Sequence, residues 1–305
     1  MIDLSVDLGK GLVLSNPLLT ASGTFGYGDE ISDLNVFDYL GGLVTKSITL
    51  MPRAGNPPPR ITETPAGMLN SIGLANIGVD AFLESKVPFY RQLNKKVIVN
   101  IAGSKPEEYI AVLEKLTTQD WVAAFEINVS CPNVKEGGIE FGKDPVVLGN
   151  LVRQLRALTG KFLIIKLTPN VTDIVSLALS GQENGADALS LINTVYGAAI
   201  DIYTRRPKIH TVIGGLSGPA IKPIALAHLI KVHRAVSLPL IGIGGISNGA
   251  DVIEFMLAGA SAVELGTVNF YNPLAAREIV AFLIKYCEDQ KIKCLREIVG
   301  QLQSA

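Results

Sequence analysis

Positions 162–169 read FLIIKLTP, an apolar run of strand length that carries one lysine, Lys166, and breaks at Pro169. Continuous rather than alternating apolar residues are typical of a strand buried on both faces, as in a parallel sheet. Seven more runs of this kind occur, each followed by a polar or glycine-rich break and then a helical period. They are LLTAS (18–22), GLVTKS (42–47), KVIVNIAG (96–103), AAFEINVS (123–130), ADALSLINT (186–194), PLIGIGG (239–245) and SAVELGT (261–267).

Eight strand–helix units that close on themselves predict an α/β fold, a TIM or (β/α)8 barrel, as a single domain over residues 1–305. Prolines mark three expected helix starts, at Pro106, Pro145 and Pro219. Residues 2–14 alternate in polarity around a glycine-rich turn, which predicts an N-terminal β-hairpin. The alternative is an open doubly wound sheet, but SGTFG (22–26) does not continue as the dinucleotide-binding glycine pattern.

Two connections are too long for plain loops, residues 48–78 and residues 195–217. Both follow a predicted strand, so we expect long inserted loops at the strand C-terminal face. Long loops inside a compact domain are usually lids or binding surfaces.

Composition excludes several classes of protein. The net charge is −1 and no basic block occurs, which argues against a nucleic-acid partner. No apolar run approaches the roughly 18 residues that span a bilayer, and Asp3 and Asp7 stand where a secretory signal would be basic. The only cysteines are Cys131, Cys287 and Cys294, a sparse set that predicts a cytoplasmic protein without disulfides or a metal site. We interpret Cys287 and Cys294 as packed thiols of a C-terminal helix.

Polar residues end the predicted strands. In a barrel of this type the active site forms at those C-terminal ends. Burying an unpaired ammonium is costly, so Lys46 and Lys166 either reach solvent or pair with an anionic or electron-rich ligand group. The strand ends are Ser22, Lys46-Ser47, Asn100, Asn128, Lys166, Asn193-Thr194, Gly244-Gly245 and Gly266-Thr267.

Asparagines and glycines suggest the ligand's chemistry. Asn70, Asn128 and Asn193 each offer donors and an acceptor that could match a pyrimidine or an isoalloxazine edge, although turn or capping roles are the alternative. Gly215, Gly218, Gly244, Gly245 and Gly266 could bring backbone N–H groups to a phosphate, or could be plain turn glycines.

Three further residues could act inside the barrel. Cys131, just past a strand end, is placed to be a base or nucleophile, although an inert thiol is the alternative. Glu126 shares strand parity with Asn128, and Glu264 with Gly266, so we expect both carboxylates to point inward. Their roles stay open.

Several strings resemble the class 1 dihydroorotate dehydrogenases, in order along nearly the whole chain. Cysteine at position 131 resembles class 1, because class 2 enzymes have serine there. AGMLN (66–70) and SGPAIKP (217–223) resemble the B type, which works with an iron–sulfur flavoprotein subunit and reduces NAD+. The other strings are ASGTFG (21–26), TKSIT (45–49), RAGNP (53–57), ETPAGMLNSIGL (63–74), NVSCPN (128–133) and GGLSGPA (214–220).

The resemblance implies one FMN per chain and oxidation of (S)-dihydroorotate to orotate in de novo pyrimidine (UMP) biosynthesis. Cys131 falls on the base that removes the C5 proton while hydride leaves C6 for flavin N5, and the loop from Cys131 to about Gly142 falls on a lid. The implied FMN contacts are Ser22, Lys46, Ser47, Asn100, Asn128, Lys166, Ile192, Gly218, Gly244, Gly245, Gly266 and Thr267. The implied substrate contacts are Lys46, Asn70, Ser71, Ile72, Gly73, Leu74, Asn128, Asn133, Asn193 and Thr194.

The resemblance also implies an electron-transfer partner subunit that holds FAD and a 2Fe–2S cluster, around a homodimer core within a heterotetramer. Four alternatives remain: an A-type, fumarate-linked dehydrogenase, a tRNA dihydrouridine synthase, a non-redox phosphate-binding isomerase or lyase, and a non-catalytic barrel subunit. The −1 charge argues against the RNA enzyme, and a non-redox barrel would leave Lys46, Lys166 and Cys131 without a task.

Overall fold

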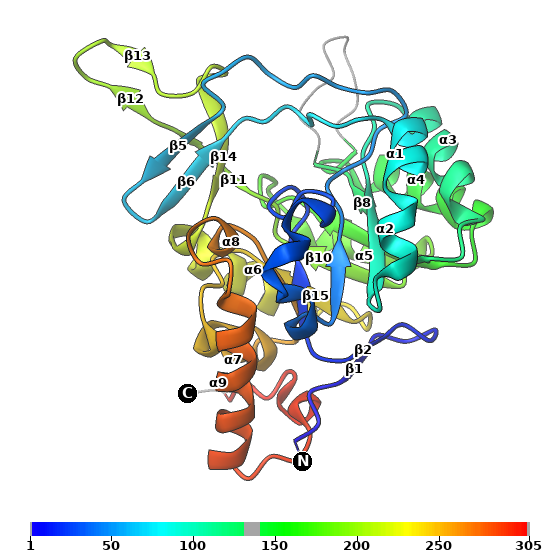
Figure 1. The fold of residues 1–305 in the computed structure, drawn as a ribbon, viewed down its shortest axis with the longest axis vertical. Coiled ribbons are helices and arrows are strands. Elements are labelled where there is room, and N and C mark those ends of the chain that lie inside the picture. The colour runs from blue at the N-terminus through cyan, green and yellow to red at the C-terminus, as the bar shows by residue number, and fades with distance from the viewer. Residues whose placement is uncertain (1, 131–140, 304–305) are drawn as a thin grey trace.

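The computed structural model describes residues 2–130 and 141–303. Eight parallel strands form a closed barrel in the order β10-β15-β16-β3-β4-β7-β8-β9, which confirms the predicted (β/α)8 fold (Figure 1). All residues of β9 are buried, as its apolar run predicts. The barrel strands are β3 (Leu18–Thr20), β4 (Gly42–Val44), β7 (Lys96–Ile101), β8 (Val122–Asn128), β9 (Phe162–Leu167), β10 (Ala188–Leu191), β15 (Leu240–Ile243) and β16 (Ala260–Leu265).

Helices connect the strands and lie outside the barrel. Pro106 and Pro145 are the first residues of their helices, as predicted, whereas Pro219 opens a short 3-10 turn (Pro219–Ile221) that leads into the next helix. The helices are α1 (Val79–Ser85), α2 (Val87–Gln92), α3 (Pro106–Thr117), α4 (Pro145–Leu158), α5 (Ile174–Glu183), α6 (Lys222–His233), α7 (Gly249–Leu257), α8 (Val268–Tyr271) and α9 (Ala275–Asp289). Other 3-10 helices cover Asp29–Leu34, Val36–Tyr39 and Leu295–Ile298.

The N-terminal hairpin closes the lower end of the barrel. β1 (Val6–Asp7) and β2 (Val13–Leu14) pair antiparallel, as predicted. Apolar side chains of this hairpin join one cluster with inward-facing residues of the strands, including Leu19, Ile98 and Ile164. Since this cluster fills the lower interior, a ligand inside the barrel would have to lie toward its C-terminal end.

The two insertions fold together over the C-terminal end. Their strands form a four-stranded sheet in the order β11-β14-β6-β5, and a two-stranded arm projects from it (Figure 1, upper left). The insertions are therefore structured rather than open loops. Their strands are β5 (Ile61–Thr64), β6 (Gly67–Asn70), β11 (Val195–Ala198), β12 (Ile200–Asp201), β13 (Arg206–Pro207) and β14 (Ile213–Ser217).

One prediction for the C-terminal region is wrong. Cys287 lies buried in α9, but Cys294 lies beyond the end of that helix at Asp289. The chain turns at Lys291, which has a φ of 59°, and the Cys294 thiol donates to Asp3 Oδ2 at 3.3 Å. The sequence does not reveal this turn, because Ile292 continues the apolar pattern of the helix.

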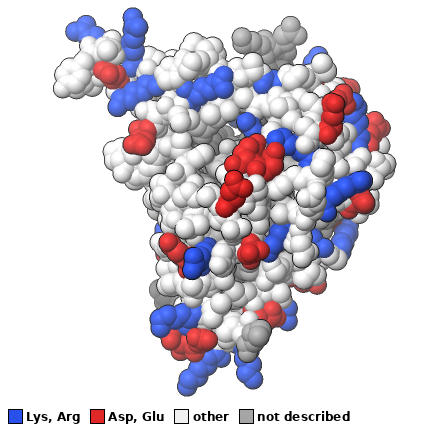
Figure 2. Space-filling model, viewed as in Figure 1, with Lys and Arg blue, Asp and Glu red and all other residues white. Residues whose placement is uncertain are grey.

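Acidic and basic side chains are interspersed over most of the face in Figure 2, and basic side chains gather over the β12–β13 arm. Within the described residues, none of the helices combines the length and the apolar character needed to cross a bilayer. Cys131, Asn133 and most of the expected lid lie outside the described residues.

Candidate active site

A polar layer lies directly above the apolar interior of the barrel. Ile98, Ala124 and Ile164 belong to the interior cluster, and side chains alternate along a strand, so residues two positions further also point inward. These residues are polar on five strands, and all are buried. They are Asn100, Glu126, Lys166, Ser190 and Glu264.

Lys166 lies between two carboxyl groups in this layer. Its Nζ atom is 2.8 Å from Glu264 Oε2 and 3.3 Å from Glu126 Oε2. Glu126 also accepts from Ser190 Oγ at 2.7 Å and from Asn100 Nδ2. The predicted inward direction of both glutamates is confirmed, and each of them pairs with Lys166.

Burial and mutual contact set the charges of this cluster. Burial and the neighbouring Glu126 raise the pKa of Glu264 well above its usual value. Burial also works against ionised Glu126, but Lys166 and hydrogen bonds with Glu264, Ser190 and Asn100 leave its pKa lowered. For Lys166, burial lowers the pKa and the two carboxyl groups outweigh it, so its pKa is raised. Lys166 therefore keeps its positive charge. It lies just below the opening at the C-terminal end of the barrel, which we call the barrel mouth.

Two asparagine amides meet at the barrel mouth. Asn193 Nδ2 donates to Asn128 Oδ1 at 3.4 Å, and the Asn128 backbone carbonyl accepts from Tyr109 Oη at 2.8 Å. In the strand register Asn128 is opposite Lys166, so the amides lie beside the lysine. The backbone N–H of Thr194 donates to Asn193 Oδ1 at 2.7 Å, which orients that amide.

The segment after β6 is held beside these amides by the other insertion. Asn70 pairs with Gly215 of β14, and its side chain donates to the Gly215 carbonyl at 3.3 Å. A Cβ on Gly73 would lie 2.7 Å from the backbone nitrogen of Asn56, so the turn fits only glycine. Ser71 Oγ is buried and has no partner among the described residues. A polar ligand at this place could supply one.

Glycines after β14, β15 and β16 form a cradle of backbone N–H groups. Gly218, Gly244 and Gly245 have φ values of 93°, 121° and 76°. In the described part of the chain, these three and Gly266 donate their N–H groups to no protein acceptor. A Cβ on Gly245 would lie 2.9 Å from the Gly218 carbonyl oxygen. Clustered free N–H groups bind phosphate well, so the cradle fits a phosphate-bearing ligand.

The remaining predicted residues lie around the same end of the barrel. Ser22 Oγ and Ser47 Oγ are 3.3 Å apart after β3 and β4, where the Lys46 backbone N–H donates to the Gly26 carbonyl. Ile192 is buried directly after β10. Thr267 Oγ1 donates to Ser217 Oγ at 2.8 Å, which ties the glycine cradle to the insertion sheet.

Two contributors were missed by the sequence analysis. Ser190 holds Glu126, and the alternation along β10 could have revealed that it points inward. Asn170 donates to the Thr194 carbonyl at 2.9 Å and accepts from the Tyr196 backbone N–H at 2.9 Å. Nothing local in the sequence indicates that bridge, because its partners come from another strand.

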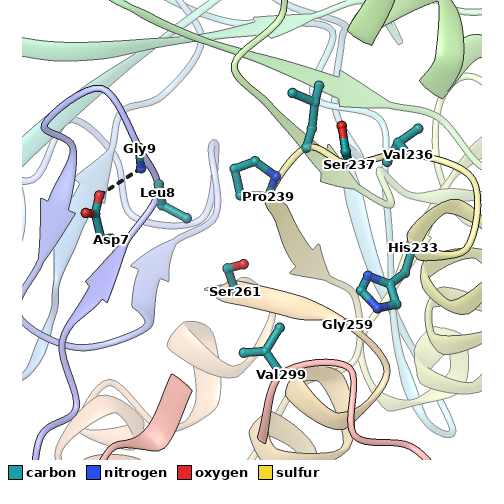
Figure 3. A pocket seen from close by; sticks show the side chains of 11 residues that line it. Asp7, Leu8, Gly9, His233, Val236, Ser237, Pro239, Gly259, Ser261 and Val299 are labelled. Atoms are coloured by element: carbon teal, nitrogen blue, oxygen red, sulfur yellow. Dashed lines mark hydrogen bonds between the residues drawn. The ribbon is translucent and has the colours of Figure 1, made fainter. Parts of the chain in front are cut away.

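A surface pocket of about 500 Å³ lies at the opposite end of the barrel (Figure 3). Its lining includes Gly9 of the N-terminal hairpin, Pro239 before β15 and Ser261 at the start of β16. It therefore lies at the strand N-terminal ends, away from the polar layer and the glycine cradle.

Comparisons with known proteins agree with this architecture. A family model described as dihydroorotate dehydrogenase matches residues 4–286. A protein of Geobacter sulfurreducens is 54% identical over 301 residues, covering 99% of this chain and 98% of its own. A protein of Trichlorobacter lovleyi is 52% identical over 300 residues, covering 98% of each chain. Both are named dihydroorotate dehydrogenase B (NAD(+)), catalytic subunit.

A solved structure shares the fold. The crystal structure of dihydroorotate dehydrogenase from Eimeria tenella in complex with ferulenol has a TM-score of 0.80 at 22% identity, covering 98% of this chain and 88% of that one. The family match over residues 4–286 and the identities above 50% together establish that this chain belongs to the dihydroorotate dehydrogenase family.

Proposed function

We propose that this chain is the catalytic subunit of a B-type dihydroorotate dehydrogenase and oxidises (S)-dihydroorotate to orotate in pyrimidine biosynthesis. The observation that carries the proposal is the paired amides of Asn128 and Asn193, which lie at the barrel mouth beside buried Lys166. This arrangement suits a flat heterocycle with alternating donors and acceptors. The B type is supported by the relatives named as NAD(+) catalytic subunits.

We propose that residues 1–305 form one domain that binds one FMN, which when bound accepts the hydride from the substrate. The glycine cradle fits its phosphate, and the polar layer fits its ring. Lys166 is the ammonium placed to favour negative charge on that ring. The proposed FMN contacts are Ser22, Lys46, Ser47, Asn100, Asn128, Lys166, Ile192, Gly218, Gly244, Gly245, Gly266 and Thr267.

The substrate would lie between the amides and the segment after β6. Asn128 and Asn193 orient its ring, and Lys46 offsets the charge of its carboxylate. Cys131 removes the C5 proton as a general base, and an unperturbed thiol pKa of about 8.5 requires only modest help for that role. The other proposed substrate contacts are Asn70, Ser71, Ile72, Gly73, Leu74, Asn133 and Thr194.

The electrons would leave through a second subunit that holds FAD and a 2Fe–2S cluster and reduces NAD+. The names of the relatives support a partner subunit, because they are called catalytic subunits, and NAD+ as the acceptor. The proposed assembly is a cytoplasmic heterotetramer built on a homodimer of this chain, and it requires neither nucleic acid nor a membrane.

The test is anaerobic mixing of the purified, FMN-loaded chain with dihydroorotate. The expected result is loss of the flavin absorption with formation of one orotate per flavin. A colourless protein that cannot be loaded with FMN, or a flavin that dihydroorotate does not bleach, would overturn the proposal. Rapid turnover with fumarate, without any partner subunit, would assign the chain to the A type.

A further inference from the structure

The proposed function employs Lys166 but leaves its two buried partners, Glu126 and Glu264, without a task. Both carboxyl groups are fully enclosed, on β8 and β16, and both contact the same Nζ atom. Asn100 and Ser190 complete the surroundings of Glu126. Beside them on β15, the residue paired with Glu264 is the apolar Ile243.

Two carboxyl groups that share one ammonium cannot both be ionised cheaply. Such a cluster would carry a net charge of −1 without solvent, and an uncompensated buried charge costs several kcal/mol. If one group keeps its proton, the cluster is neutral. Burial therefore favours one ionised and one protonated carboxyl group.

The hydrogen bonds distinguish the two groups. Glu126 accepts from Lys166, Ser190 and Asn100, and donors of this kind stabilise an ionised carboxylate. Glu264 accepts from Lys166 and shares a hydrogen bond with Glu126, and its Oε1 atom is buried without a partner among the described residues. The proton therefore belongs on Glu264.

We propose that Glu126 and Glu264 are positioning residues of unequal charge that tune the flavin through Lys166. Glu126 is the ionised counter-ion that limits the positive charge below the flavin, and Glu264 is a neutral hydrogen-bonding group that holds the ammonium in place. The direction of both pKa shifts, raised for Glu264 and lowered for Glu126, agrees with this assignment.

The consequence is a charge-dependent reduction potential. Two-electron reduction adds negative charge to FMN, so an ammonium below the ring favours reduction and a carboxylate beside that ammonium opposes it. Removing Glu126 alone should change the potential little, because Glu264 then has no carboxylate neighbour and can release its proton to balance Lys166. Removing both carboxyl groups leaves the ammonium uncompensated and should make bound FMN easier to reduce. Replacing Glu264 by its neutral isostere should change the potential little.

The inference rests on the proposed function, because it requires that FMN binds above Lys166. The test measures the midpoint potential of bound FMN at neutral pH. Glu126→Gln combined with Glu264→Gln should raise the equilibrium constant for two-electron reduction about tenfold, a shift of about +30 mV. Glu126→Gln alone should change that constant less than about threefold. Glu264→Gln should change that constant less than about threefold. The matched control is Asp187→Asn, which neutralises a buried carboxylate paired with Arg156 at the start of β10, far from the mouth. It should leave the potential unchanged.

A second measurement needs only well-folded protein and no flavin. Infrared spectra of the apoprotein should contain the carbonyl stretch of a protonated carboxyl group, and Glu264→Gln should remove it. Absence of that band from the wild type, or its loss in Glu126→Gln with retention in Glu264→Gln, would overturn the assignment. An unchanged potential in the variant that lacks both carboxyl groups would overturn their role in tuning the flavin.

The two proposals fail in different ways. Bleaching of the flavin by dihydroorotate tests the reaction in the unmodified chain and is independent of where the proton lies. The infrared band reports the proton on Glu264 even in a protein that never turns over dihydroorotate.

Discussion

The side-chain amide of Asn70 donates a 3.3 Å hydrogen bond to the carbonyl oxygen of Gly215, although 145 positions separate the two residues. Asn70 ends β6 and begins the proposed substrate segment, and Gly215 belongs to β14 of the other insertion. Thr194 packs against the open side of Gly215. This contact therefore places residues from both insertions beside the barrel mouth.

Gly215→Ala should weaken substrate binding. A Cβ on Gly215 would lie 2.2 Å from Thr194 Oγ1 and 2.6 Å from Thr194 Cβ, so Thr194 or β14 must move. We expect a rise of about tenfold in the KM for dihydroorotate, because small misplacements at a site cost that much or more. FMN content should be retained. The control is Gly160→Ala, where an added Cβ meets nothing within 4 Å. An unchanged KM would contradict the prediction.

Gly245→Ala should weaken FMN binding. The residue has a φ of 76°, and its Cβ would lie 2.8 Å from the Lys222 backbone nitrogen and 2.9 Å from the Gly218 carbonyl oxygen. The cradle must open, and a tenfold higher Kd for FMN corresponds to about 1.4 kcal/mol. Fluorescence titration of the apoprotein measures it. Gly9→Ala has the same backbone strain without any close contact and should keep the wild-type Kd.

Lys166→Met should destabilise the apoprotein by about 3–5 kcal/mol, because it leaves buried carboxyl groups without their counter-ion. Urea unfolding measures the free energy of unfolding. Adding Glu126→Gln to Lys166→Met should recover part of the loss, since the ionised partner is then gone as well. Additive effects of the two substitutions would show that the pair is not coupled.

Stability at high pH should depend on Glu264. Burial and Glu126 raise its folded-state pKa above the usual value of 4.5. Between pH 4.5 and the raised folded-state pKa, the unfolded chain has released the Glu264 proton and the folded chain still keeps it. The contribution of Glu264 to the free energy of unfolding is therefore fully present below about pH 4.5 and is lost as the pH rises through the folded-state pKa.

Glu264→Gln removes that titration. The free energy of unfolding of the wild type, minus that of the variant, should therefore decline from about pH 4.5 upward, by at most about 1.4 kcal/mol per pH unit. Thermal and urea unfolding across pH 4–9 measure the difference. Parallel curves for the two proteins would contradict a raised pKa.

Cys131→Ala should keep FMN bound and slow its reduction by dihydroorotate about 10²- to 10⁴-fold, the usual loss when a general base is removed. Stopped-flow mixing under anaerobic conditions measures the rate. Cys294→Ala provides the matched control, because that thiol contacts Asp3 next to the N-terminus. Wild-type reduction kinetics in Cys131→Ala would remove the thiol from the mechanism.

Local sequence was sufficient to predict the barrel and to predict which strand residues point into it. The run at 162–169 is buried along β9 because a strand covered on both faces must be apolar throughout. Glu126 and Glu264 point inward because side chains alternate along a strand, a property independent of distant residues. The N-terminal hairpin likewise follows from its own alternation.

Tertiary structure decided which of these groups meet. The sequence placed Lys166 at a strand end, but only barrel closure brings it between Glu126 on β8 and Glu264 on β16. The insertions were expected as loops because their short strands lack a strong apolar pattern, and Asn70 finds Gly215 only after both have folded over the barrel. The residues of a strand determine which of its side chains are buried. The polar partners of those side chains come from distant parts of the sequence, so they are decided only when the barrel closes.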